Sequence, residues 1–496
     1  MAARRLSQVT FRLAAMAIPS IDDVTRSGFL LAGEWIQAGE KVEVRSPFDD
    51  SLVGKTWNAE RQHVERAIAA AVSSCAELRQ LAAYQRKDIL LKVAAAIREH
   101  AATFIRLMAL EAGKPFKPAK AEVDRAVLTF TTAAEESVRI EGEYLPLDFI
   151  PGTEKRWGIV KRFPIGPIAA ITPFNFPLNL VAHKLAPAMA VGCPVVLKPA
   201  PQTPFCALLL ARLILESAWP RAALSVLPLK NDDAGQLVTD ERIKLLSFTG
   251  SAAVGWELKG KAGKKKVVLE LGGNAAVIVH EDAHLDVAVP RCVAGAFGYA
   301  GQSCISVQRI LVHANIFDQF TARMMQGAGQ LRVGDPLDEN IDVGPLIRAS
   351  DAQRVEDWIA EAVRGGAKLL CGGKARGTLF EPTLLSGTKP EMKVNCEEIF
   401  ASVATIEPYY DFDDALQQIN QSRFGLQSGL FTRNAELIFR AFDRLEVGGV
   451  IVSDVPTFRV DPMPYGGVKD SGLGREGIRY SMEEMTERKL LVMPGF

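Results

Sequence analysis

Cys304 stands alone between a glycine turn and an apolar run, in the stretch FGYAGQSCISVQRI that spans residues 297–310. The thiolate of a cysteine is a strong nucleophile, but only roughly a few per cent of an ordinary thiol is ionised at neutral pH. A catalytic cysteine therefore needs surroundings that activate it. A free cysteine is more often a small apolar core residue, and this segment alone leaves both interpretations open.

Two polar residues next to apolar stretches could assist such a nucleophile. Glu270 lies at the end of an apolar run, just before LGGN. Burial would raise the pKa of its carboxyl toward the range of a general base, whereas a strand-end glutamate that reaches solvent is the simpler alternative. Asn175 lies between two prolines and two aromatic residues in TPFNFP. Its amide could donate a hydrogen bond to an oxyanion, or it could cap a turn.

Two further segments could bind a cofactor that carries phosphate. In SFTGSAAVG, residues 247–255, Gly250 and Ser251 separate an apolar run from a helical stretch. Such a turn lets backbone N–H groups approach a phosphate, although the spacing is not G-x-G-x-x-G and an ordinary βα turn stays open. Lys198 ends another apolar run, where its ammonium could meet a ribose hydroxyl or an extra phosphate, or could extend to solvent.

These residues need elements that bring them together, and the apolar pattern predicts two successive α/β domains. Helical spacing predicts one helix around residues 64–75 and a second from about 89 to 108, closed by Gly113-Lys114-Pro115. Buried parallel strands are then predicted in two sets. The first set is 167–171, 194–198, 244–248 and 267–271, and the second is 276–279, 309–313, 381–385, 429–432 and 448–452.

Residues 141–163 fit neither domain. Their polarity alternates around a turn at Pro151-Gly152, which predicts a hairpin that leaves the body. The C-terminal LLVMPGF is strand-like and could pair with such a hairpin, including one of another subunit.

The composition is that of a neutral globular enzyme. The chain carries 58 basic and 58 acidic residues, so charge gives no reason to expect a nucleic acid or an acidic membrane as partner. Seven scattered cysteines without a CxxC pair, and six dispersed histidines, predict neither a disulfide framework nor a metal site. A reducing compartment fits best.

The first residues bear on location. Arg4, Arg5 and Arg12 precede the first acid, Asp22, which is weakly similar to a mitochondrial presequence. We expect residues 1–25 to form an N-terminal extension and the protein to be cytoplasmic, with a mitochondrial location as the alternative. No run reaches the roughly 18 apolar residues that a membrane-spanning helix needs.

Taken in order, these motifs resemble those of the aldehyde dehydrogenase superfamily. PFNFP, LKPA, FTGS, ELGG and GQSC follow one another along the chain, and Cys304 comes 34 residues after Glu270, as in the family pattern. Downstream, EEIF (397–400) and PYGGVKDSGLGREG (464–477) match two more family motifs. The resemblance covers most of the chain from about residue 30 onward.

The resemblance implies an α/β fold with a Rossmann-like cofactor domain, an α/β catalytic domain and a β-hairpin oligomerisation element. The expected boundaries are 26–140 with 163–272 for the NAD(P)-binding domain, 273–465 for the catalytic domain, and 141–162 with 480–496 for the oligomerisation element. A homodimer or homotetramer is expected.

The resemblance also implies residue roles. Cys304 would be the nucleophile, Asn175 and the backbone N–H of Cys304 would hold the oxyanion, and Glu270 would activate the water that hydrolyses a thioester. NAD(P) would bind through a set drawn from the same motifs: Thr172, Phe174, Lys198, Gly250, Ser251, Glu398 and Phe400. No metal is expected.

One departure from the family pattern bears on the cofactor. Members that prefer NAD often have a glutamate three residues after the lysine, whereas Pro201 stands there in this chain. Without that carboxylate there is room and positive charge for a 2′-phosphate, so we expect NADP to be accepted and even preferred. Other departures are Leu229, Ala401-Ser402 and Ser453.

The stretch SDVPTFRVDPMPYGG, residues 453–467, resembles a branch with enzymes for lactaldehyde and succinic semialdehyde. In that interpretation Arg125 and Arg459 face the substrate and bind an anionic group, although a solvated helix face and a structural ion pair are the alternatives. Succinic semialdehyde is the first expectation, followed by lactaldehyde and sulfo- or phospho-aldehydes. Two rival hypotheses are a CoA-acylating enzyme, which Glu270 argues against, and a non-catalytic homologue.

Overall fold

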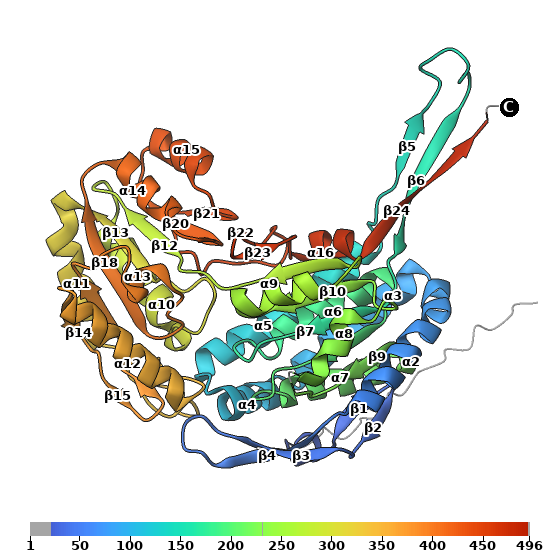
Figure 1. Ribbon diagram of the computed structural model, residues 1–496, viewed down its shortest axis with the longest axis horizontal. Helices are drawn as coiled ribbons and strands as arrows, with labels where there is room; N and C mark the ends of the chain where they lie inside the picture. The colour runs from blue at the N-terminus through green and yellow to red at the C-terminus, as the bar shows by residue number, and fades with distance from the viewer. Residues whose placement is uncertain (1–20, 231, 495–496) are drawn as a thin grey trace, which may run out of the picture.

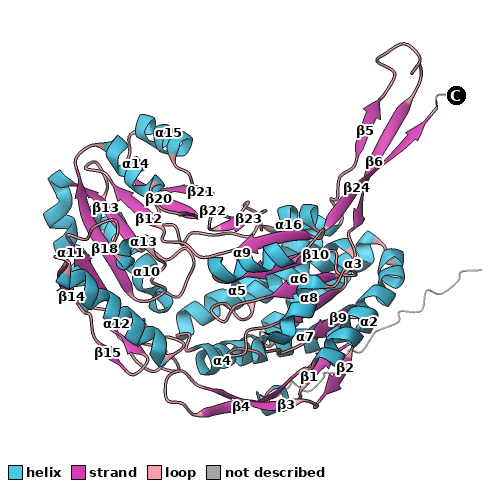
Figure 2. Ribbon diagram, viewed as in Figure 1, coloured by secondary structure: helices cyan, strands magenta, loops and turns pink. Residues whose placement is uncertain are grey.

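The computed structural model describes residues 21–230 and 232–494. Two α/β lobes lie side by side, and a slender three-stranded arm projects from one of them (Figure 1). Both lobes combine helices with a mostly parallel sheet (Figure 2), which confirms the α/β class predicted from the sequence. Most of the predicted N-terminal extension, residues 1–25, lies outside the described residues.

The first lobe is built on an eight-stranded sheet. Its strands, in spatial order, are β2 (Glu34–Ile36), β1 (Phe29–Leu31), β9 (Leu224–Val226), β8 (Val195–Lys198), β7 (Ile168–Ile171), β10 (Leu245–Thr249), β11 (Lys266–Glu270) and β23 (Gly472–Leu473). The five strands from β9 to β11 are parallel, and β1 and β23 pair antiparallel at either side of them. All four strands predicted for this region are present and lie next to one another.

Helices cover both faces of this sheet, which explains why its central strands are largely apolar. Within β7, Ile168 and Ala170 belong to one core, while Ala169 and Ile171 belong to the other, as the two-residue period of a strand requires. The helices of this lobe are α1 (Ile21–Val24), α2 (Arg61–Gln80), α3 (Ala83–Glu99), α4 (Ala101–Ala112), α5 (Phe116–Ser137), α6 (Asn179–Val191), α7 (Phe205–Glu216), α8 (Gly235–Thr239), α9 (Ala252–Lys261) and α16 (Ile478–Glu484).

The second predicted helix is in fact two, α3 and α4, which meet at His100. His100 is the C-cap of α3 and the N-cap of α4, with a backbone conformation outside the helical range. The apolar spacing runs through this break, so spacing alone could not reveal it. Gly113 closes α4 in the left-handed region as predicted, with φ of 63°.

The second lobe holds a seven-stranded sheet, parallel except for its edge strand β14. Its order is β14 (Lys368–Cys371), β17 (Thr383–Ser386), β18 (Val403–Tyr409), β13 (Arg309–His313), β12 (Ala276–Val279), β20 (Gln427–Phe431) and β21 (Gly449–Val452). Its main helices are α10 (Leu285–Phe297), α11 (Phe317–Gly329), α12 (Ala349–Arg364), α14 (Phe412–Asn420) and α15 (Ala435–Arg444). The five strands predicted here are all present.

The arm consists of β5 (Glu143–Pro146), β6 (Trp157–Pro164) and β24 (Thr486–Met493). The predicted hairpin with its turn at Pro151-Gly152 is confirmed, and the C-terminal strand pairs with β6 of the same chain, from Thr486 opposite Pro164 to Met493 opposite Trp157. Several apolar side chains of the arm are exposed: Tyr144, Phe149, Ile150, Leu490, Leu491 and Val492. The exact domain boundaries, like the oligomeric state, stay predictions.

A buried ion pair between Lys114 and Glu122 ties several segments of the first lobe together. Both side chains are fully buried. The other oxygen of Glu122 accepts hydrogen bonds from the backbone N–H groups of Leu178 and Asn179, each at 2.9 Å, and so caps the first turn of α6. The Lys114 ammonium lies 3.7 Å from the centre of the Phe176 ring.

Among the described residues, no helix is long and apolar enough to cross a membrane. Nor do residues 21–230 and 232–494 contain a group of three histidine, cysteine, aspartate or glutamate side chains placed to hold a metal ion.

We expect Glu122→Ala to destabilise the protein strongly, because it leaves the Lys114 ammonium buried without its carboxylate. Removing one partner of a buried pair typically costs about 3–5 kcal/mol, so the urea midpoint of unfolding should fall clearly. Lys120→Met is a matched control, since it removes an exposed ion pair with Asp124 from the same helix and should change stability by no more than about 1 kcal/mol. Equal midpoints for the two variants would contradict a structural role for the buried pair.

Candidate active site

The carboxyl ends of the parallel strands in the first lobe carry several of the predicted residues. Lys198 ends β8 and Glu270 ends β11, while Gly250 follows β10. Ser251 is the N-cap of α9, so this turn opens directly onto a helix N-terminus. Open α/β sheets bind ligands at this end, where backbone N–H groups also favour anions.

A cavity of about 300 Å³ brings most of the predicted residues together. The predicted residues that line it are Arg125, Phe174, Asn175, Gly250, Ser251, Glu270, Cys304, Glu398, Phe400 and Arg459. Thr172 and Lys198 do not line this cavity. Both are buried at the ends of neighbouring strands, where the Thr172 N–H donates to the Lys198 carbonyl over 3.1 Å.

The turn before Cys304 has an unusual backbone. Tyr299 and Ala300 adopt left-handed conformations with φ of 52° and 53°, and Gly301 follows with φ of 69°. A Cβ at Gly301 would lie 2.0 Å from the Ala401 carbonyl oxygen, so a glycine is required there. Two consecutive non-glycine residues with left-handed backbone conformations cost conformational free energy, and such strain is typical of functional sites.

Cys304 is partly buried, and its Sγ lies 3.0 Å from the hydroxyl oxygen of Tyr465. Burial raises the pKa of the Cys304 thiol to about 11, while the Tyr465 hydroxyl and the Arg459 charge act to lower it. In the structure as described, the thiol is therefore mostly protonated at neutral pH.

Glu270 is buried, with 4% of its surface exposed, and neither of its carboxyl oxygens has a hydrogen-bond partner among the described residues. Burial and the nearby negative charge of Glu476 raise its pKa well above the ordinary value. A carboxyl with this raised proton affinity and two free oxygens suits the transfer of a proton to or from a bound molecule.

Asn175 lies on the loop between β7 and α6. Its Nδ2 donates one hydrogen bond to the Gln302 carbonyl over 3.0 Å, next to the Cys304 turn. An amide nitrogen carries two hydrogens, so this bond fixes the side chain and leaves a second donor.

Glu398 and Phe400 belong to the second lobe, between β17 and β18, and line the same cavity. Glu398 accepts a hydrogen bond from the Gly273 N–H over 3.0 Å, and burial raises its pKa to about 7. A Cβ at Gly272 would lie 2.2 Å from a Glu398 oxygen, so the paired glycines of ELGG make room for this carboxyl. The Phe400 ring meets the Phe174 ring edge-on at 6.0 Å.

The Lys198 ammonium has no hydrogen-bond or ion-pair partner within the part of the chain that the structure describes, and burial lowers its pKa to about 8. A buried lysine without a partner is costly unless a ligand supplies an acceptor. Its place at the end of β8 fits a ribose or a phosphate of a dinucleotide.

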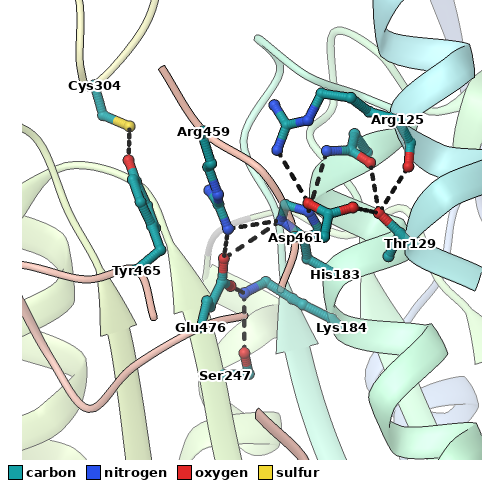
Figure 3. Close-up of polar contacts among 11 residues, drawn as sticks. Arg125, Thr129, His183, Lys184, Ser247, Cys304, Arg459, Asp461, Tyr465 and Glu476 are labelled. Atoms are coloured by element: carbon teal, nitrogen blue, oxygen red, sulfur yellow. Dashed lines mark hydrogen bonds and ion pairs between the residues drawn. The ribbon is translucent and has the colours of Figure 1, made fainter. Parts of the chain in front are cut away.

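A connected set of charged side chains borders the cavity (Figure 3). Arg459 donates from Nη2 to Glu476 over 3.0 Å and lies 3.1 Å from His183 Nδ1. His183 Nε2 in turn lies 3.0 Å from Asp461, which Arg125 also contacts at 3.3 Å. Both predicted guanidinium groups are therefore anchored by carboxylates at the edge of the cavity.

This network contains the residues that sequence analysis did not single out. Tyr465 and Glu476 lie within the matched motif 464–477. The motif therefore pointed to these positions, but it did not predict which side chains they contact. His183 lies on α6 one helical turn after Asn179, so helical spacing alone does not connect it with the loop that carries Asn175. Nothing in the local sequence distinguishes Asp461 from other aspartates in loops.

Residues 35–491 match the family model described as the aldehyde dehydrogenase family. The chain belongs to that family. A 3-sulfolactaldehyde dehydrogenase of Priestia megaterium is 42% identical, with 96% of this chain and 99% of that protein covered. The NADP-dependent succinate-semialdehyde dehydrogenase of Escherichia coli is 38% identical, with 94% of this chain and 97% of the relative covered.

Solved structures agree with this assignment. Aldehyde dehydrogenase 21 of Physcomitrella patens, in complex with the reaction product succinate, superposes with a TM-score of 0.94. It is 43% identical, with 95% of this chain and 98% of that chain covered. The resemblance and the NAD(P)-dependent aldehyde oxidoreductase activity predicted from the sequence are thus confirmed, while the substrate of this aldehyde dehydrogenase and the roles of its residues are not.

Because burial raises the pKa of Cys304 to about 11, alkylation of this aldehyde dehydrogenase by iodoacetamide should accelerate about tenfold per pH unit between pH 7 and 9. Mass spectrometry of the labelled peptide separates Cys304 from the other cysteines. Cys304→Ala is the control for any background labelling. A rate at Cys304 that levels off below pH 8 would show that the thiol is more acidic than its surroundings predict.

Proposed function

We propose that this chain oxidises a short aldehyde with an anionic end, succinic semialdehyde first, to its carboxylic acid, and that Cys304 is the nucleophile. The observation that carries the substrate class is the pair of guanidinium groups, Arg125 and Arg459, at the edge of the cavity that Cys304 lines. The Nε of Arg125 is buried without a hydrogen-bond partner among the described residues, so it is a free donor for an anion.

The reaction begins when the Cys304 sulfur attacks the carbonyl carbon while its proton leaves toward Glu270. The second N–H of Asn175 and the backbone N–H of Cys304 hold the oxyanion that forms. Removing one such donor typically costs about 10²–10³ in rate. A bound NAD(P) would supply the hydride acceptor for this carbon, and Cys304 would then carry the acyl group as a thioester.

Glu270 first releases the proton of Cys304 to solvent. It then takes a proton from the water that attacks the thioester and returns this proton to the Cys304 sulfur, which leaves as the acid is released. Its raised pKa suits this role, because burial makes the Glu270 carboxylate a stronger base than an ordinary one. The free carboxyl oxygens of Glu270 leave room for a water molecule. Hydrolysis rather than transfer to CoA is therefore part of the proposal.

For the cofactor, Lys198 would bind the adenosine ribose or its 2′-phosphate, with Thr172 at the neighbouring strand end. Gly250 and Ser251 would present backbone N–H groups at the N-terminus of α9. A second set would contact the nicotinamide half: Phe174, Glu398 and Phe400.

Lactaldehyde or another hydroxy-, sulfo- or phospho-aldehyde is the second candidate. The identity of 42% with a 3-sulfolactaldehyde dehydrogenase favours it. The same guanidinium pair would bind a sulfonate or phosphate, because both groups accept two parallel hydrogen bonds from arginine. A homodimer or homotetramer, with the apolar surface of the arm covered by a partner copy, completes the proposal.

The substrate class is tested by kcat/KM with NADP for succinic semialdehyde against butanal, an uncharged aldehyde of equal chain length. We expect the semialdehyde to be favoured at least about 100-fold, because a charged hydrogen bond is worth about 1.5–3 kcal/mol and two are available. Arg125→Met should lower this ratio about 10- to 100-fold. Arg354→Met, which removes another guanidinium from the cavity lining, should leave the ratio unchanged, and equal values for the two aldehydes in the wild type would refute an anion-binding pocket.

The cofactor assignment predicts a pH dependence of NADP affinity. Only protonated Lys198 attracts a 2′-phosphate, and with a pKa of about 8 this form declines as pH rises. The Kd for NADP, measured by fluorescence titration, should therefore increase up to about tenfold per unit above pH 8, whereas that for NAD changes less. Lys198→Met should abolish the difference. Strict NAD dependence of the wild type would contradict the NADP preference.

A further inference from the structure

Tyr465 is the polar side chain that contacts the reactive sulfur. Its hydroxyl oxygen lies 3.0 Å from Cys304 Sγ, and the two residues are separated by 161 positions in the chain. Tyr465 is 2% exposed and lines the same cavity as Cys304. Figure 3 shows its ring directed with the hydroxyl toward the sulfur.

Arg459 covers the ring of Tyr465. Its guanidinium carbon lies 3.6 Å from the ring centre, which is a close cation–π contact, while Glu476 holds the same guanidinium from the side. A cation over the ring face withdraws electron density from the phenol and makes its O–H a stronger hydrogen-bond donor. Tyr465 is thereby fixed in position and polarised toward Cys304.

The other charged groups that face the sulfur act against its ionisation. Glu270 on β11 and Glu398 beyond the turn both raise the pKa of Cys304, as does burial, which is the largest effect. Arg459 and Tyr465 act in the opposite direction. Formation of a thiolate in this cavity therefore depends on these two residues.

We propose that Tyr465 is a catalytic residue that donates a hydrogen bond to the Cys304 thiolate, with Arg459 stacked on its ring to strengthen that donor. The proposal deepens the function proposed above and rests on Cys304 being the nucleophile. A neutral thiol forms only a weak hydrogen bond with a hydroxyl, whereas a thiolate accepts a charge-assisted one of roughly twice the strength. The hydroxyl therefore stabilises the ionised form selectively.

Tyr465 keeps its own proton throughout. Burial and the nearby negative groups raise the pKa of its phenol well above the ordinary value, so it acts as a donor and not as a base. The proton lost by Cys304 goes to Glu270, as in the mechanism above, and no bond to the tyrosine forms or breaks.

The test is the iodoacetamide reaction of Cys304 in Tyr465→Phe, measured without aldehyde or cofactor. Phenylalanine keeps the ring under Arg459 and removes only the hydroxyl. We expect the thiol pKa to rise by about one unit. The thiolate fraction then falls about tenfold, its intrinsic nucleophilicity rises about threefold, and alkylation slows about threefold at each pH between 7 and 9.

Tyr409→Phe is the matched control, because it also removes one buried hydroxyl, here bonded to His280 over 2.7 Å and outside the cavity. Its alkylation rate should equal that of the wild type. An unchanged rate in Tyr465→Phe would overturn the proposal, and a faster one would show that the hydroxyl restrains the thiol instead of stabilising the thiolate.

The alkylation assay separates this inference from the proposed function. Wild-type protein that fails to oxidise succinic semialdehyde, yet loses Cys304 reactivity in Tyr465→Phe, would contradict the substrate assignment and support the role of Tyr465. If the wild-type protein oxidises the semialdehyde but Tyr465→Phe leaves the alkylation rate unchanged, the substrate assignment is supported and the role of Tyr465 is contradicted.

Discussion

The buried ion pair between Lys114 and Glu122 is the interaction on which the geometry of the site depends. Glu122 caps the first turn of α6, just after Asn175, and Lys114 lies against the rings of Phe176 and Tyr299 at 3.7 and 4.2 Å. One pair of charges thus orients the loop that carries the amide donor and the turn that carries the thiol. Because neither charge tolerates isolation from water, the two segments are held in one arrangement.

A buried charge normally needs a partner, so buried ionisable side chains without one indicate where a ligand could bind. Arg459, Lys184 and His183 surround Glu476, and although burial acts to raise its pKa, these groups hold it well below the ordinary value. The carboxyl oxygens of Glu270 lie near this set and have no hydrogen-bond partner among the described residues. Lys198 is a second group without a partner, at the end of β8. Within the described part of the chain, the structural charges have partners, while the side chains of Glu270 and Lys198 do not, as the ligand roles proposed for these two groups require.

The sequence predicted those features that depend on local pattern, namely the strands and the residues at their ends. Apolar runs bounded by glycine and proline fixed the strands, and a residue at the carboxyl end of a parallel strand, such as Glu270, is placed in the site by topology alone. Side-chain contacts between residues distant in the sequence could not be predicted from local pattern. The contact of Cys304 with Tyr465 joins residues 161 positions apart, and the break at His100 lies within unbroken helical spacing. The pairing of the C-terminal strand with the hairpin was predicted, but the sequence did not show whether that hairpin belonged to the same chain. Such features depend on tertiary packing, which periodicity does not describe.

Arg459 links the two halves of the proposed chemistry. Its guanidinium stacks on Tyr465, which contacts the nucleophile, and it borders the cavity where an anionic substrate group would bind. An anion bound there would offset part of the positive potential that favours the Cys304 thiolate. A hydroxyl hydrogen bond is short-ranged and is lost only if the sulfur moves, so it would persist when the charge is screened. A site that uses one cation for both tasks therefore needs a neutral donor at the sulfur, and Tyr465 is placed to supply it.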